Sequence, residues 1–547
     1  MSLNSRRWES TPDLARGAKD ALFPLTSETA EVLPRPHARL THVARSSILI
    51  GVLFGLDKLL GLVRQVIIGR QFGVSRELDA FNAANNLPDL LFALITGGAL
   101  AIAFIPVLSE YLDQGGRQAA WDLFSRVANW AFVITGILAV LIFFFASPIV
   151  RSQIGVAPGF SPELQTLVSD LMRLNLVATL IFSLSGLVIA GLQANQHFLL
   201  PALAPSMYDV GQIFGALILA PDRGYQVAGI TLPAAGLGVH GLVYGVIIGA
   251  SLHLGVQVPP LIKYGFRWTP QLSLDHPGLR KVARLMGPRI LTIGAFQLVF
   301  VMQDNLASRL DIGSITALAY GWLIMQVPET IIATAIGTAI LPTLAKHFAR
   351  RDDGAFEASI GRAASLLLAI TLPVAVILMI GIQPLIQFAF RFDARGTELV
   401  TWAARAYLVG LVGHSLLEVG ARAFYARQNA RIPLLASALS TGVFMLSAIA
   451  LFRLLGAAGI GLSNSLAFTI EALFLLVLLA RSFPGVLPRK RQVGRALLAA
   501  LAAGVVAALV AAAAPLGEAG SSILAAGLGS LIAIPFIWPE LRQLASL

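Results

Sequence analysis

The chain has 547 residues, of which 56% are apolar and only 13% are charged, and its mean hydropathy is +0.77. Soluble domains carry about 25% charged residues, so this composition excludes an ordinary soluble protein and predicts an integral membrane protein. The sequence contains no cysteine, which excludes disulfides, thiolate metal sites and cysteine nucleophiles.

Fourteen apolar segments are predicted to be membrane-spanning helices, because about 20 apolar residues cross the hydrocarbon core of a bilayer. The runs are continuously apolar, which disfavours spanning β-strands of about 10 alternating residues and makes the predicted fold class all-α. The first six lie near 44–70, 79–109, 124–148, 166–192, 199–220 and 237–262. The others lie near 285–309, 314–345, 361–390, 398–424, 432–455, 458–480, 493–514 and 521–538.

The first twelve segments form two lobes of six helices that share local sequence. GLQANQHFLLPAL at 191–203 resembles YARQNARIPLLAS at 425–437, and both stretches occupy the same place in their halves. Because six is an even number, the two pseudo-symmetric lobes share one orientation, and such lobes usually rock about a site between them. The predicted organisation is a polar cytoplasmic tail at 1–43, an N-lobe at 44–262, a basic cytoplasmic linker at 263–284, a C-lobe at 285–480 and two C-terminal helices within 481–547.

Basic residues gather on one side of the predicted helices. Lys263, Arg267, Arg350 and Arg351 lie on that side together with both termini, whereas the opposite loops hold isolated arginines such as Arg223. Lys and Arg in short loops stay in the cytoplasm, so both termini are predicted to be cytoplasmic. The net charge of +11 then reflects topology and contact with anionic membrane lipids, not nucleic-acid binding.

The first apolar segment carries Asp57, Lys58 and Arg64 near its middle. Charge at bilayer depth is costly unless it faces a cavity or a partner, so these side chains cannot point at lipid. Asp57 and Arg64 are seven residues apart and share one helical face, which favours an internal salt bridge. The alternative is a cationic cavity lining that binds a pyrophosphate, a ligand that needs several charged donors.

The second segment carries a polar stripe. Asp79, Asn82, Asn86 and Asp89 recur at helical spacing, and Pro88 is predicted to bend the helix beside them. This pattern indicates a cavity, although Asp79 also fits a solvated outer helix end.

The C-lobe has polar residues of its own, namely Gln297, Asp304, Ser308, Glu329, His414, Glu418 and Arg422. The last three are spaced by four and predict an internally paired ladder on one helix. The sequence has no HExxH, no GxSxG and no glycine-rich phosphate loop, so we assign no catalytic residue, no metal ligand and no enzyme activity.

Six stretches, in order along residues 45–480, resemble the MurJ (MviN) family of lipid II flippases, in the superfamily that also holds the MATE exporters. The stretches are GLVRQVIIGRQFG, LDAFNAANNLPDLL, GGALAIAFIPVLSEY, RKVARLMGPRIL, LASRLDIGSITALAY and AIGTAILPTLAKHF. The resemblance implies a plasma-membrane transporter that alternates between inward-open and outward-open states. Its implied substrate is a polyprenyl-pyrophosphate-linked peptidoglycan precursor, lipid II or a related lipid-linked oligosaccharide, which it moves to the outer leaflet.

The resemblance also implies roles for individual residues. Lys58 and Arg64 would line the central cavity, and the acid at Asp79 would matter for function. Some family members bind Na⁺ in the second lobe through an acid on one helix and polar side chains on another, which makes Asp304 a candidate ion ligand. The other helix offers Ser437, Ser440, Thr441 and Ser447 but no carboxylate. Coupling to H⁺ or to the membrane potential is the alternative, and no cofactor is implied. Other proteins of cell-envelope synthesis are candidate partners.

The chain departs from the family at two expected cations. Phe92 and Leu323 stand where the family carries arginines, which predicts weaker pyrophosphate binding or a lipid-linked substrate other than standard lipid II. MATE-like efflux, a non-transporting membrane scaffold and a membrane-bound glycosyltransferase are the alternatives. The basic cavity argues against efflux, the retained Arg64 and Asp79 argue against a scaffold, and the short loops argue against a glycosyltransferase.

Overall fold

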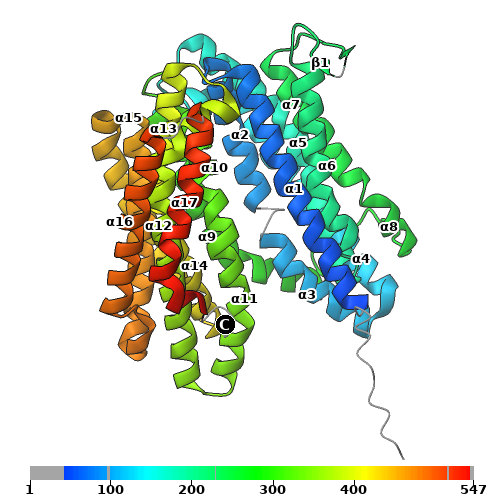
Figure 1. Cartoon of the computed structure of the whole chain (residues 1–547). Helices are drawn as coiled ribbons and strands as arrows, with labels where there is room; N and C mark the ends of the chain where they lie inside the picture. Colours follow the sequence, from blue (N-terminus) through cyan, green and yellow to red (C-terminus); the bar gives the residue numbers. More distant parts are fainter. Residues whose placement is uncertain (1–41, 95–98, 228, 514–516, 543–547) are drawn as a thin grey trace, which may run out of the picture. The chain divides into compact units, whose positions relative to one another are not determined.

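The computed structural model describes residues 42–94, 99–227, 229–513 and 517–542, nearly all of them as helices and turns (Figure 1). The chain divides into two units, Met1–Ser47 and Ile48–Leu547. All the cavities and side-chain contacts described below belong to the second unit. The predicted cytoplasmic tail lies, up to residue 41, outside the described residues.

The first half of the chain contains eight α-helices, one π-helix and a two-stranded antiparallel hairpin among its described residues. The helices are α1 His42–Phe72, α2 Arg76–Phe92, α3 Ala99–Gln114, α4 Gly116–Arg151, α5 Pro162–Ala194, α6 Leu199–Phe214, η2 Gly215–Leu219, α7 Val239–Gly255 and α8 Val258–Lys263. The hairpin strands are β1 Gln226–Val227 and β2 Ile230–Thr231, with Gln226 opposite Thr231.

The second half continues with the longest helices of the described chain. Its elements are α9 Pro277–Ala307, α10 Ser314–Pro328, η3 Glu329–Thr334, α11 Ala335–Ala349, α12 Asp353–Phe390, α13 Ala394–Val409, α14 Leu411–Ala426, α15 Arg431–Ser482, η4 Pro484–Val486, α16 Lys490–Ala513 and α17 Gly517–Leu541. Within α15, Gly456 has a φ of 60° and a ψ of −142°, so α15 is two helices that meet at a sharp break. This break lies where the sequence predicts one segment to end and the next to begin.

Several helices begin earlier than hydropathy predicts. The helix predicted from residue 285 begins at Pro277, because proline suits the first position of a helix, and the helix predicted from residue 361 begins after the N-cap Asp352. The predicted starts of these two helices were wrong. Their first turns contain charged residues, which lower the local hydropathy, but these turns are still helical.

The helices pack in two groups, which meet where α2, α3 and α4 contact α9 and where α2 contacts α10. In the first half, α5 lies against α2, α4 and α7, and α6 lies against α7. In the second half, α13 lies against α10 and α15, while α16 and α17 pack on each other and on α12 (Figure 1). Because α2 contacts both α9 and α10, its polar side chains can reach residues of both halves.

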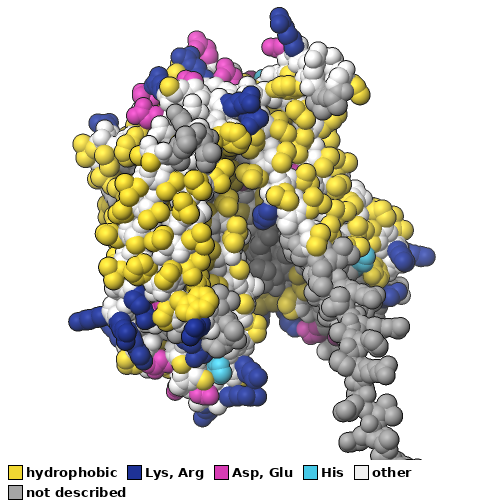
Figure 2. Space-filling model, viewed as in Figure 1, with side chains coloured by type: hydrophobic (Ala, Val, Ile, Leu, Met, Phe, Trp, Pro, Cys, Tyr) yellow, Lys and Arg dark blue, Asp and Glu magenta, His cyan; other side chains and the backbone are white. Residues whose placement is uncertain are grey.

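The surface of the molecule matches a bilayer. Nine stretches of the described residues are helices long and apolar enough to cross a membrane. Figure 2 shows apolar side chains over the middle of the visible face, with Lys, Arg, Asp and Glu side chains gathered toward its ends. The all-α membrane fold is thus confirmed, and the count of fourteen spans stays a prediction.

Candidate functional site

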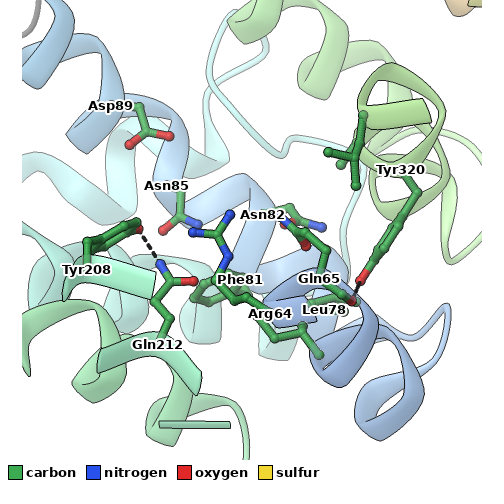
Figure 3. Close-up of a pocket in the computed structure, with 13 residues that line it drawn as sticks. Arg64, Gln65, Leu78, Phe81, Asn82, Asn85, Asp89, Tyr208, Gln212 and Tyr320 are labelled. Atoms are coloured by element: carbon green, nitrogen blue, oxygen red, sulfur yellow. Dashed lines mark hydrogen bonds between the residues drawn. The ribbon is translucent and has the colours of Figure 1, made fainter. Parts of the chain in front are cut away.

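Three cavities adjoin α2, and Asn85 and Asp89 line all of them. The first has a volume of about 240 Å³, and Arg64, Asn82 and Tyr320 are on its wall (Figure 3). The second, of about 370 Å³, lies among the helices of the first half, and the third, of about 310 Å³, reaches α9 and α10. The shared residues make these cavities one polar region around α2.

Arg64 is held by an acid that the sequence analysis did not single out. Its Nη1 donates to Oδ1 of Asp209 on α6 at 2.7 Å, and its guanidinium lies 5.6 Å from the centre of the Tyr208 ring. The predicted salt bridge between Asp57 and Arg64 was wrong, because Asp57 lies 3.5 Å from Lys58 instead. An isolated acid inside the apolar run 199–220 is the signal that could have identified Asp209.

Asp79 joins the two halves of the chain. Its carboxylate accepts hydrogen bonds from the backbone N–H groups of Gly313 (2.6 Å) and Thr316 (2.7 Å) and from the Thr316 hydroxyl (2.6 Å). These groups form the N-terminus of α10, where backbone N–H groups and the helix dipole favour an anion. Asp79 is only 1% exposed, so the solvated helix end was the wrong interpretation.

The rest of the polar stripe divides between the two halves. Asn86 donates to Oδ2 of Asp304 on α9 at 2.6 Å, and Asn82 donates to the Thr316 hydroxyl at 3.4 Å. On the other side of α2, Asn175 of α5 donates to Oδ1 of Asn85 at 2.6 Å. The sequence analysis missed Asn85, which lies one residue before Asn86 and faces all three cavities.

Asp89 is the unpaired charge of this region. Its side chain makes no hydrogen bond or ion pair with any other described residue, although it lines all three cavities. The described cavity walls carry one arginine, Arg64, against two acids, Asp89 and Asp304, while Lys58 has a side chain that is 75% exposed. The sequence analysis had expected a predominantly cationic lining, and the described cavity walls do not have one.

The candidate ion ligands of the C-lobe lie in two places. Asp304 contacts Asn86, and its neighbour Gln303 accepts a hydrogen bond from the Tyr407 hydroxyl at 2.7 Å. Ser437 instead donates to Oε1 of Glu471 at 2.8 Å, and this buried acid was missed in the sequence. Among the described residues, no three His, Cys, Asp or Glu side chains form a group that could hold a metal ion. A Na⁺ site at Asp304 stays a prediction.

The predicted ladder on α14 is half confirmed. Glu418 and Arg422 form an ion pair one turn apart. His414 does not join this ion pair. Its Nε2 lies 3.2 Å from Oδ1 of Asn464, and its ring stacks on that of Phe468 with ring centres 4.1 Å apart. The other polar residues singled out in this half are separate as well. Gln297 lines the third cavity, Ser308 accepts from the backbone N–H of Gly159, and Glu329 accepts from Thr334.

Known proteins are similar to this chain in sequence and in fold. The family model "Lipid II flippase MurJ" matches residues 68–534. The chain belongs to the MurJ family. The lipid II flippase MurJ of Burkholderia cenocepacia is 30% identical over 434 residues, which cover 77% of this chain and 81% of the relative. The probable lipid II flippase MurJ of Haemophilus influenzae is 25% identical, over 82% of this chain and 89% of the relative.

Solved structures agree in fold. A lipid II flippase MurJ in an inward closed conformation matches with a TM-score of 0.75 and 22% identity, over 90% of this chain and 100% of that chain. An inward-facing MATE family transporter of the MOP superfamily matches with a TM-score of 0.66 and 15% identity, over 80% of this chain and 98% of that one. The helical architecture is therefore that of MurJ and MATE transporters.

Phe92 and Leu323, where the resemblance led the sequence analysis to expect arginines, both line the cavities. Leu323 is on the wall of the first cavity, and Phe92 is on the wall of the second, where its ring centre lies 5.3 Å from that of Phe182. Two positions at which the sequence analysis expects family arginines are thus apolar parts of the cavity walls. Asp89 adds an acid to the same surface.

Proposed function

We propose that this protein is a flippase that moves a polyprenyl-pyrophosphate-linked cell-wall precursor, lipid II or a related glycolipid, from the inner to the outer leaflet. The observation that carries the proposal is membership of the MurJ family across residues 68–534. The site of action is the plasma membrane, with both termini in the cytoplasm. The protein acts by alternating access rather than by catalysis.

The polar region around α2 supports this proposal because it can hold a headgroup between helices of both halves. Arg64 provides a guanidinium, Asn82 and Asn86 provide amide donors, and Lys58 adds an ammonium group on α1, the helix that carries Arg64. Asp209 neutralises Arg64 when no headgroup is bound. An arriving pyrophosphate would then compete with Asp209 for the guanidinium, which suits reversible binding.

In this mechanism, the hydrogen bonds between Asp79 and the start of α10 are the contact that changes between the inward-open and outward-open states. In the predicted topology, the start of α2 and the start of α10 lie at the outer end of the molecule. Their charge-assisted hydrogen bonds hold that end closed. Opening outward requires these bonds to break, so headgroup binding must favour the state without them. The membrane potential, Na⁺ or H⁺ supplies the driving force in this scheme.

MATE-like efflux of a small cation is the second candidate, and one observation favours it. Asp89 is unpaired among the described residues and faces the cavities, where an arriving cation would meet it. Sensitivity of cells to cationic drugs separates the two functions, because efflux lowers it and flipping of a cell-wall precursor does not.

Complementation of cells depleted of their own lipid II flippase tests the proposal. We expect the unaltered chain to rescue growth weakly, because two contacts worth about 1.5 to 3 kcal/mol each are absent at Phe92 and Leu323. Together they correspond to roughly 10² to 10⁴ in affinity. The double change Phe92→Arg with Leu323→Arg should improve rescue, and Arg64→Ala should abolish it.

Expression and folding of each variant are checked by membrane content and by monodispersity in detergent. Arg453→Gln is a suitable control, because Arg453 stacks on Phe452 away from the three cavities. Absence of rescue by every folded variant would exclude lipid II as the substrate. Full rescue by the unaltered chain would instead show that the missing arginines cost nothing.

A further inference from the structure

A fourth cavity lies in the second half of the chain and shares no lining residue with the cavities around α2. It is a groove of about 810 Å³ between α12, α13 and α15, next to the break at Gly456. Its wall is mostly apolar, and Leu454, Leu455 and Trp402 are among its exposed side chains. A groove of this size accommodates a ligand of several hundred cubic ångströms.

Arg405 is a half-buried basic residue of this groove. It lies eleven positions after the start of α13, where its Nε donates to the carbonyl oxygen of Met379 at 2.8 Å and its guanidinium lies 5.1 Å from the centre of the Trp402 ring. Its terminal NH groups make no hydrogen bond to any described residue. A guanidinium at membrane depth is costly without an acceptor, so these donors are available to an anionic group.

Glu398 is the acid of the same groove. It lies seven residues before Arg405, so both side chains project from one face of α13 with Cα atoms separated by a rise of about 10 Å. Glu398 is exposed and forms no ion pair with any described residue, whereas Arg395 at the rim is paired with Asp311 at 3.1 Å. The groove therefore presents one free anion and one free cation in a fixed order along the helix.

We propose that this groove binds a phospholipid with a phosphoethanolamine headgroup. Arg405 binds the phosphate, Glu398 binds the ammonium group, and an acyl chain lies along Val409 and Leu462, which line the groove on the inner side of Arg405. In the predicted topology α13 runs inward from the outer surface, so Glu398 is nearer to water than Arg405. The ammonium of such a lipid also lies outside its phosphate. This proposal does not depend on the transported substrate.

Native mass spectrometry of the full-length protein tests the proposal. The protein is delipidated in detergent and then titrated with phosphatidylethanolamine, phosphatidylglycerol or phosphatidylcholine of equal chain length. We expect one tightly bound phosphatidylethanolamine and about tenfold weaker binding of the other two lipids. Arg405→Gln should weaken binding of all three lipids, and Arg453→Gln, which alters a residue outside the groove, should change none of them.

The acid gives the decisive comparison. Glu398→Gln removes the partner of the ammonium group, so the affinity for phosphatidylethanolamine should fall about tenfold while that for phosphatidylglycerol rises. Glu398 is exposed, so this variant is expected to fold even if Arg405→Gln does not, and Arg405→Lys then replaces the latter. Equal binding of all three lipids, or a lipid preference that Glu398→Gln leaves unchanged, would overturn the proposal.

Discussion

The pairing of Arg64 with Asp209 solves the problem that a charge inside an apolar helix creates. A lone guanidinium at that depth would be strongly unfavourable, and the carboxylate on α6 neutralises it. The side chains of Arg64 and Asp209 are 18% and 6% exposed, so the pair is largely shielded, while Arg64 still lines the cavity. This position lets Arg64 pair with Asp209 and, in the function proposed above, also bind the headgroup.

Removing the acid tests the structural half of that argument. Asp209→Ala leaves Arg64 without its partner, so we expect the free energy of unfolding to fall by about 3 kcal/mol, at the lower end for broken buried pairs because Arg64 stays partly exposed. Thermal unfolding in detergent measures the loss. Exchange of the two charges, Arg64→Asp with Asp209→Arg, should restore most of the stability but not transport. An unchanged melting temperature in Asp209→Ala would show that the pair adds little.

Sequence reasoning could single out Arg64 and Asp209 as charges within apolar runs, but it could not pair them. A charge within an apolar run is conspicuous by itself, and the same holds for Asp79. The partner of Arg64 lies 145 residues away on another helix, and no periodicity encodes such a contact. Asp57, seven residues away, was the nearest candidate on the same helix, and local spacing favoured it for that reason alone.

At the scale of elements, α6 reaches its position through glycines. A Cβ added to Gly211 would lie 2.3 Å from Cα of Gly249 on α7, and one added to Gly215 would lie 2.6 Å from Cα of Gly245. Two helices approach this closely when small residues recur at intervals of four along their contact. Since α6 carries Asp209, the contact with α7 also fixes the acid opposite Arg64.

A single methyl group should disturb this contact. Gly211→Ala places its Cβ against the backbone of α7, so we expect a loss of about 1 to 3 kcal/mol in stability as the helices separate. Gly136→Ala in α4 is the matched control, because a Cβ there meets no atom within 4 Å and alanine favours the helix. Both variants are compared by thermal unfolding in the same detergent. Equal melting temperatures would contradict the close-packing argument.

The existence of the helices was predictable, and their ends were less so. Apolar runs identified each long helix because the bilayer requires them, and glycine at position 456 marked a break within α15. The capping residues Ser75 and Asp352 and the first-turn proline Pro277 set the actual starts, where hydropathy has no signal. Interhelical contacts such as the one from Asp79 to α10 depend on packing and were not predictable from local pattern.

At the scale of the whole molecule, the open question is how many times the chain crosses the membrane. Nine described stretches meet the length and hydropathy that a span requires, whereas the sequence predicts fourteen spans. Two elements account for part of the difference. The 52 residues of α15 count as one stretch although they hold two predicted spans, and α2 is short and only weakly apolar because it carries Asp79, Asn82, Asn85, Asn86 and Asp89. An odd count places the two ends of the chain on opposite sides of the membrane, and an even count places them on the same side.

Three single cysteines in this cysteine-free chain distinguish the counts. Ile154 is 91% exposed between α4 and α5, Asp275 has a side chain that is 89% exposed before α9, and Arg542 is exposed at the end of α17. With fourteen spans, we expect an impermeant thiol reagent to label Ile154→Cys in intact cells, and Asp275→Cys and Arg542→Cys only after lysis. With nine spans, the last span would carry Arg542 to the side opposite Asp275. Labelling of Arg542→Cys but not Asp275→Cys in intact cells would therefore exclude the fourteen-span topology, and with it the placement of both termini in the cytoplasm.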